Sequence, residues 1–262
     1  MKTFRQRALE LVRVFLALYL LGNITYPLSR WLWLEVFRLG PLHAELGASF
    51  FESALDILAV LLVFPRRLGF AGSRKHMLVG VAIAAGLTGA MVIGHLLGMV
   101  RWTPHQLRGQ QWIYLIGFSV RAAVSEELVC RYLVLDRLGR VIGTPAAFLL
   151  QILLFVYLHM FGPPISKGTA VWLVIGAVLF GSLYLWRRSL LAVMALHFTY
   201  DLLVRLSFGS MMDGLIVYPL IVGDNFSKLY GDRAGELFMI VLSVWMLWRI
   251  RQRKRAAPET PC

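Results

Sequence analysis

The sequence predicts an all-α membrane protein, a polytopic bundle of about eight transmembrane helices in a single integral membrane domain over residues 1–262. Of these residues, 58% are hydrophobic and only 16% are charged, which is more apolar surface than one soluble core can hide. Apolar runs of membrane-spanning length recur along nearly the whole chain. Because lipid offers the backbone no hydrogen bonds, these runs are expected to be helices.

The expected spans follow one another with short connections. The first is expected to end at 23–27, and no small-residue cleavage site follows it, so it is interpreted as retained. The segment 208–235, which is rich in glycine, is expected to be a re-entrant or interfacial piece on the outer side. The approximate boundaries of the eight spans are 8–26, 47–64, 77–100, 111–135, 145–161, 169–186, 189–207 and 236–250.

The net charge of +13 comes from basic residues at the ends of the apolar runs. This distribution follows the positive-inside rule, so we expect both termini in the cytoplasm and a basic cytoplasmic tail at 251–262. The same rule explains the arginines without a nucleic-acid partner. The basic residues that flank the spans include Lys2, Arg5, Arg7, Arg66, Arg67, Arg74, Lys75, Arg187, Arg188, Arg249, Arg251, Arg253, Lys254 and Arg255.

Few ionisable residues lie inside the spans, where each costs about 2.5 to 3.5 kcal/mol unless it has a partner or a function. With a rise of about 1.5 Å per residue, four of those in spans four, five and seven lie roughly 12 to 21 Å from the inner boundary, in the middle of a ~30 Å hydrocarbon layer. These four are Glu126, His159, His197 and Asp201, and we expect them to converge on one buried cavity. Span four also carries Glu127 and Arg131.

The spacing within each helix suggests partners. Glu127 and Arg131 are four residues apart and can form an ion pair, which leaves Glu126 on the neighbouring face to point at a water. Arg131 can alternatively bind a substrate's terminal carboxylate. Asp201 follows His197 by one turn and can hold its imidazole in one tautomer or face the cavity.

A second group of charges lies in the outer halves of the spans. Glu52 and Asp56 belong to span two, and Arg121 to span four. We interpret these residues as structural and expect a salt bridge between Asp56 and Arg121.

Three motifs follow one another along residues 111–207, which we interpret as the catalytic motif core. They are Glu126-Glu127 with Arg131, Phe155 with His159, and His197 with Asp201. The chain resembles the CPBP family of intramembrane proteases, which comprises CAAX-type prenyl endopeptidases and bacteriocin-processing or immunity proteins of the Abi type. That family is marked by EExxxR, FxxxH and Hxxx(N/D) on successive apolar segments.

The chain departs from the family pattern at three positions. Cys130 and Tyr132 flank the motif arginine, where members commonly carry an aromatic residue and glycine. Asp201 stands where the prenyl endopeptidases typically have asparagine. The resemblance therefore supports the fold and the chemistry, but not prenylated CAAX substrates.

The resemblance implies an intramembrane endopeptidase in which four side chains are catalytic. Glu126 is expected to act as general base on a water with His159, while His197 and Asp201 steady the tetrahedral intermediate. Glu127 and Arg131 are expected to support them. An ionised Asp201 would repel the oxyanion, so we expect it either to be protonated or to orient His197.

A metal-dependent reaction is the alternative chemistry. Two imidazoles and a carboxylate are a common set of zinc ligands. The candidate ligands here are Glu126, His159 and His197. The histidines lack HExxH spacing, so we favour a metal-free glutamate mechanism with no cofactor over one with a divalent metal such as zinc.

Two other functions compete with proteolysis. A non-catalytic scaffold or immunity protein of the same fold predicts degraded motifs, whereas these are intact. An ion-coupled transporter predicts an internal repeat, and none is apparent. We expect membrane lipids and a membrane-anchored peptide or protein substrate as partners. Arginine-rich, lysine-poor usage favours the inner membrane of a bacterium.

Overall fold

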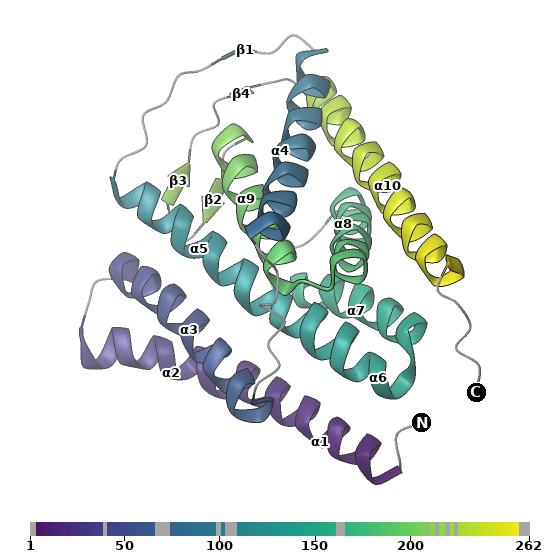
Figure 1. Ribbon diagram of the computed structural model, residues 1–262. Helices are drawn as coiled ribbons and strands as arrows, with labels where there is room; N and C mark the ends of the chain where they lie inside the picture. The colour runs from purple at the N-terminus through teal and green to yellow at the C-terminus, as the bar shows by residue number, and fades with distance from the viewer. Residues whose placement is uncertain are drawn as a thin grey trace.

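The computed structural model describes residues 4–38, 41–65, 74–97, 101–102, 109–160, 166–208, 210–212, 215–217, 221–222 and 225–256. Helices dominate these residues. Four of them are long and apolar enough to cross a membrane, namely Phe4–Val36, Arg74–Leu96, Lys167–Arg187 and Leu190–Phe208, and Thr144–His159 is a shorter apolar helix. The predicted all-α membrane bundle is therefore the architecture observed (Figure 1).

The first helix is longer than predicted. It runs through α1 (Phe4–Leu20), the π-helical turn η1 (Leu21–Thr25), α2 (Tyr26–Trp31) and a second π-helical turn, η2 (Leu32–Val36). The expectation of a helix end at 23–27 is wrong. Pro27 lies in the first turn of α2, directly after the π-helical turn, where the hydrogen-bond register changes and its missing N–H is tolerated.

The remaining helices cover the other predicted spans. They are α3 (Pro41–Val63), α4 (Arg74–Leu96), α5 (Gly109–Glu127), the π-helix η3 (Leu128–Leu138), α6 (Gly139–Ile142), α7 (Thr144–His159), α8 (Lys167–Arg187), α9 (Leu190–Phe208) and α10 (Asn225–Ala256). Because α10 extends beyond both predicted ends, the first residues of the expected tail, 251–256, are helical. Residues 66, 67 and 257–262 lie outside the described part of the chain.

Four short strands depart from the purely helical prediction. In two antiparallel pairs, β1 (Arg101–Trp102) lies beside β4 (Ile221–Val222) and β2 (Ser210–Met212) beside β3 (Leu215–Val217). Three of the strands fall in the glycine-rich segment 208–235, whose other described residues are the last residue of α9 and the first part of α10. These strands connect helices and do not alter the bundle.

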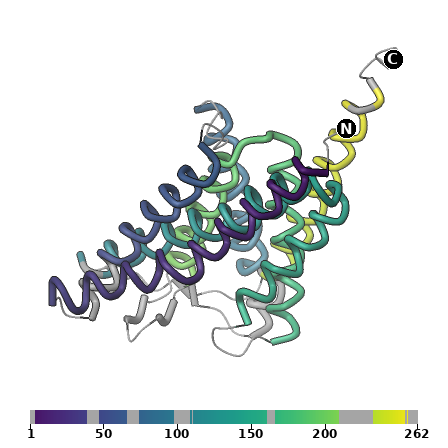
Figure 2. The backbone as a smooth tube through the Cα atoms, turned by 90° about the horizontal axis from the view of Figure 1, so that it is seen from below, coloured from purple at the N-terminus to yellow at the C-terminus, as the bar shows by residue number. Residues whose placement is uncertain are grey.

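A long helix formed by α5 and η3 runs between two groups of helices (Figure 1). On one side, α3 packs on α5 and α1 packs on η3. On the other side, α9 packs on α5 and α4, while α10 covers α4 and α8. The start of α1 and the end of α10 lie at the same end of the molecule (Figures 1 and 2).

The centre of the bundle is dense and its outside is apolar. Leucines of η3, α8 and α9, such as Leu128, Leu179 and Leu196, have no exposed surface. By contrast, α1 and α10 expose large apolar side chains, among them Phe15 and Val244. An apolar exterior of this kind suits contact with lipid rather than water.

Candidate active site

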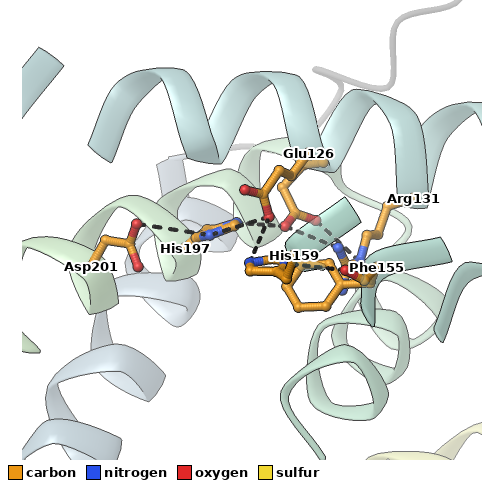
Figure 3. A network of polar contacts seen from close by, with 7 residues as sticks. Glu126, Arg131, Phe155, His159, His197 and Asp201 are labelled. Atoms are coloured by element: carbon orange, nitrogen blue, oxygen red, sulfur yellow. Dashed lines mark hydrogen bonds and ion pairs between the residues drawn. The ribbon is translucent and has the colours of Figure 1, made fainter. Parts of the chain in front are cut away.

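Both motif glutamates lie at a change of helix type. Glu126 and Glu127 are the last two residues of α5, and η3 begins at Leu128. Segments of π-helix are frequent at functional sites because the wider turn redirects side chains. Here Arg131 projects among buried rings, whereas Glu126 projects toward two imidazoles (Figure 3).

The predicted ion pair between Glu127 and Arg131 is present. Arg131 Nε lies 3.2 Å from Glu127 Oε2, and Arg131 Nη1 donates to Glu127 Oε1 at 3.2 Å. Both side chains are completely buried. The guanidinium lies 4.8 Å from the ring centroid of Phe155 and 5.1 Å from that of Phe180. Arg131 is thus enclosed by protein and has no surface with which to bind a substrate's carboxylate.

Glu127 has a second partner that sequence reasoning missed. Its Oε1 lies 2.7 Å from His197 Nδ1, across seventy residues of sequence. Asp201 Oδ2 lies 4.0 Å from His197 Nε2, which is beyond hydrogen-bond distance. Glu127, not Asp201, therefore orients this imidazole. In the sequence, only the presence of two adjacent glutamates hinted at this contact with His197. It was missed because the four-residue spacing already gave Glu127 a partner in Arg131.

His159 is oriented by its own helix. It is the last residue of α7, and its Nδ1 lies 2.8 Å from the carbonyl oxygen of Phe155. A carbonyl can only accept, so Nδ1 carries the proton and donates. The rings of Phe155 and His159 also contact each other, with centroids 4.6 Å apart. Phe155 therefore supports both His159 and Arg131.

The three motifs converge on one carboxylate oxygen. Glu126 Oε2 lies 3.9 Å from His159 Nε2 and 4.0 Å from His197 Nε2 (Figure 3). The side chains of Glu126 and His159 are 25% and 32% exposed, whereas that of His197 is 6% exposed. Side chains from α5, α7 and α9 thus meet here, as the sequence predicted, but the site is partly exposed at Glu126 and His159 and is not the fully buried cavity expected.

The outer charged residues pair differently from the prediction. Arg121 Nε forms its salt bridge with Glu52 Oε2 at 3.3 Å, one turn before Asp56 on α3. Asp56 is buried and accepts a hydrogen bond of 2.5 Å from Ser125 Oγ. The sequence could not distinguish the two acids because they share a face of α3. This bond ties α3 to the residue that precedes Glu126.

As arranged, the candidate ligands do not fit a metal ion. No group of three or more histidine, cysteine, aspartate or glutamate side chains could hold one within the described residues. Two ligands of a tetrahedral zinc lie roughly 3.3 Å apart. The two nitrogens lie farther than this from Glu126 Oε2.

Residues 108–203 match the family model of the type II CAAX prenyl endopeptidase Rce1-like proteins. Over these residues the chain is similar to that family. This match agrees with the resemblance drawn from the motifs, and the matched family is one of proteases. The matched residues include all three motifs and the helices from α5 to most of α9. No curated protein and no solved structure matches the chain.

Proposed function

We propose that the protein is an intramembrane endopeptidase that hydrolyses a peptide bond of a membrane-associated protein or peptide. The observation that carries the proposal is the approach of His159 Nε2 and His197 Nε2 to the same oxygen of Glu126. In each imidazole, Nδ1 is held by another group, so Nε2 is the nitrogen left for chemistry. The match of residues 108–203 to a protease family supports the same reaction class.

In this proposal Glu126 is the general base. The gaps of 3.9 and 4.0 Å are too long for direct hydrogen bonds but suit a bridging water. Glu126 accepts a proton from this water as its oxygen attacks the scissile carbonyl, and His159 Nε2 helps to orient it. Both groups are within reach of a water bound at the open side of the site.

His197 and Asp201 steady the tetrahedral intermediate in this scheme. The Glu127 carboxylate at Nδ1 favours the protonated imidazole, whose Nε2–H then donates to the oxyanion. Since Glu127 already orients the ring, we propose that Asp201 acts beside Nε2 and not in orienting the imidazole. When the intermediate collapses, the proton held by Glu126 passes to the leaving amine, which leaves a free carboxylate and an amine.

We propose a reaction without a metal. The histidine nitrogens that a metal would need lie too far from Glu126 Oε2 for one tetrahedral ion. The base, the water-orienting group and the oxyanion donor are all supplied by side chains of the chain itself.

We further propose that the eight long helical segments cross the membrane and that both termini lie in the cytoplasm, in the inner membrane of a bacterium. The even number of crossings is supported by the start of α1 and the end of α10, which share one end of the molecule (Figure 2). The basic ends of the helices support the orientation. The site then lies at mid-membrane depth, which favours a membrane-anchored substrate.

The decisive experiment compares membrane proteomes of the source cell with the active chain and with Glu126→Gln. New N-termini or C-termini, read by mass spectrometry, should appear only with the active chain. Glu236→Gln is the matched control, because Glu236 pairs with Arg233 on α10, a helix that supplies none of the motif residues. If purified Glu126→Gln cleaved the identified substrate as well as the unmodified chain, Glu126 would be rejected as the general base. If no new termini appeared with the active chain, proteolysis would be rejected in favour of a scaffold or transporter.

A further inference from the structure

Two arginines from different helices meet at the end of the bundle where α8 finishes. Arg187 is the last residue of α8, and its guanidinium stacks 3.6 Å from the ring centroid of Trp186. Arg253, near the end of α10, donates from Nη1 to the backbone carbonyl of Trp186 at 3.2 Å. Both guanidinium groups are therefore held at the same residue.

This arrangement leaves positive charge uncompensated. The charges of Arg187 and Arg253 repel each other, and the structure records no ion pair for either within its described residues. Arg187 Nε is buried without a hydrogen-bond partner. The nearby Asp136 is engaged by Arg140 at 2.6 Å and by Arg188 at 3.7 Å. Two convergent guanidinium groups with open donors are the usual receptor for a phosphate or carboxylate.

The surroundings place these arginines at the level of lipid headgroups. Trp186 packs edge-on against Trp245 of α10, with ring centroids 5.0 Å apart. Tryptophan gathers at the membrane–water interface, where its ring is apolar and its N–H is wet.

We propose that Arg187 and Arg253 form a binding site for the phosphodiester of an anionic phospholipid. The open guanidinium donors hold the phosphate. The tryptophan pair beside the arginines is the reason to assign a lipid rather than a free phosphate ion, because it places the site at the membrane–water interface. The site is separate from the proposed catalytic residues and does not depend on proteolysis.

The test measures lipid binding to the purified full-length chain by native mass spectrometry and by thermal stabilisation. The probes are phosphatidylglycerol, phosphatidylcholine and inorganic phosphate. Arg187→Gln/Arg253→Gln is compared with Arg251→Gln/Arg255→Gln, which removes the same charge from exposed positions of α10. Binding is measured in about 0.5 M salt, because the Debye length then falls to roughly 4 Å. Non-specific attraction between anionic lipid and the other basic residues is thereby screened.

We expect the first variant to bind phosphatidylglycerol about tenfold more weakly or worse, and the control variant to change less than about twofold. An equal loss in both variants, equal binding of phosphatidylcholine by the unmodified chain, or full competition by inorganic phosphate would overturn the site. If the glutamine variant does not fold, Arg187→Lys/Arg253→Lys keeps the charge but lacks the planar fork. Undiminished binding by that lysine variant would equally count against the proposal.

Discussion

At the scale of single residues, the two adjacent glutamates have separate partners and separate expected roles. Glu127 is completely buried between Arg131 and His197. Glu126 is partly exposed and faces two imidazole nitrogens. The same isosteric change at each position should therefore give different results.

Glu126→Gln should abolish cleavage while changing the unfolding free energy by less than about 1 kcal/mol, because no close ion pair is lost. Glu127→Gln should lower the unfolding free energy by roughly 3 to 5 kcal/mol, because it leaves Arg131 buried without its counter-ion. Thermal unfolding of the two purified variants, alongside cleavage assays, measures both effects. Equal stability losses in the two variants would contradict the assignment of these partners.

Substitutions of Asp201 test whether this residue acts as a neutral hydrogen-bond donor or is needed as an acid. If Asp201 acts as a neutral donor, Asp201→Asn should retain cleavage within about tenfold, since an amide also donates. Asp201→Ala should lower kcat by about a hundredfold or more, as for loss of an oxyanion donor. The comparison is made on kcat with the identified substrate. A loss with asparagine as large as that with alanine would show that the acid itself is needed.

Metal removal tests the proposed chemistry directly. Because side chains alone supply the base and the donor, we expect prolonged dialysis against a strong chelator to leave kcat unchanged. Elemental analysis of the active protein should likewise find zinc well below one equivalent. Activity that disappears on dialysis and returns with zinc would instead support Glu126, His159 and His197 as ligands.

At the scale of elements, the placement of α9 depends on a close approach to α4. A side chain at Gly80 would bring Cβ within 2.1 Å of the carbonyl oxygen of Ala192 and 2.8 Å of the amide nitrogen of Leu196. Leu196 directly precedes His197. Any displacement of α9 at this crossing therefore moves a proposed catalytic imidazole.

Gly80→Ala should cost about 1 to 3 kcal/mol of stability through overpacking and should lower kcat, because His197 shifts relative to Glu126. Gly89→Ala is the matched control on the same helix, since nothing lies within 4 Å of the place that its methyl group would take. That change should be neutral or stabilise the protein by up to about 1 kcal/mol. Equal effects of the two substitutions on kcat would contradict the role of the crossing.

At the scale of the whole molecule, the bundle combines buried polar residues with an apolar exterior. The Asp56–Ser125 hydrogen bond and the Glu52–Arg121 salt bridge join α3 to α5. The salt bridge between Glu10 and Arg137, at 2.7 Å, joins α1 to η3. These polar links tie α1 and α3 to the long helix of α5 and η3 that carries Glu126.

The proposed topology predicts where the helix ends can be labelled. With both cysteines replaced by serine, Arg5→Cys and Arg255→Cys should each resist a membrane-impermeant maleimide applied to intact spheroplasts. Both should react after the membrane is opened, because both ends are expected on the cytoplasmic side. Labelling of only one of them in intact spheroplasts would reject an even number of crossings.

The features that the sequence by itself determined are those governed by local spacing and composition. Apolar run length predicted the helices, and the four-residue spacing predicted the Glu127–Arg131 pair, because neighbours on one helix meet whatever packs around them. The residues of the three motifs could also be identified from their spacing along the sequence. Continuation of the first helix past Pro27 was missed, since nothing in its composition announces a π-helical turn.

Only the tertiary structure decided which groups from different helices meet. It placed His197 on Glu127 rather than Asp201, and Arg121 on Glu52 rather than Asp56. The rotation of each helix about its axis and its distance from its neighbours settle such choices, and both depend on close packing such as that at Gly80. A sequence lists candidate partners by type, whereas packing of the whole bundle selects among them.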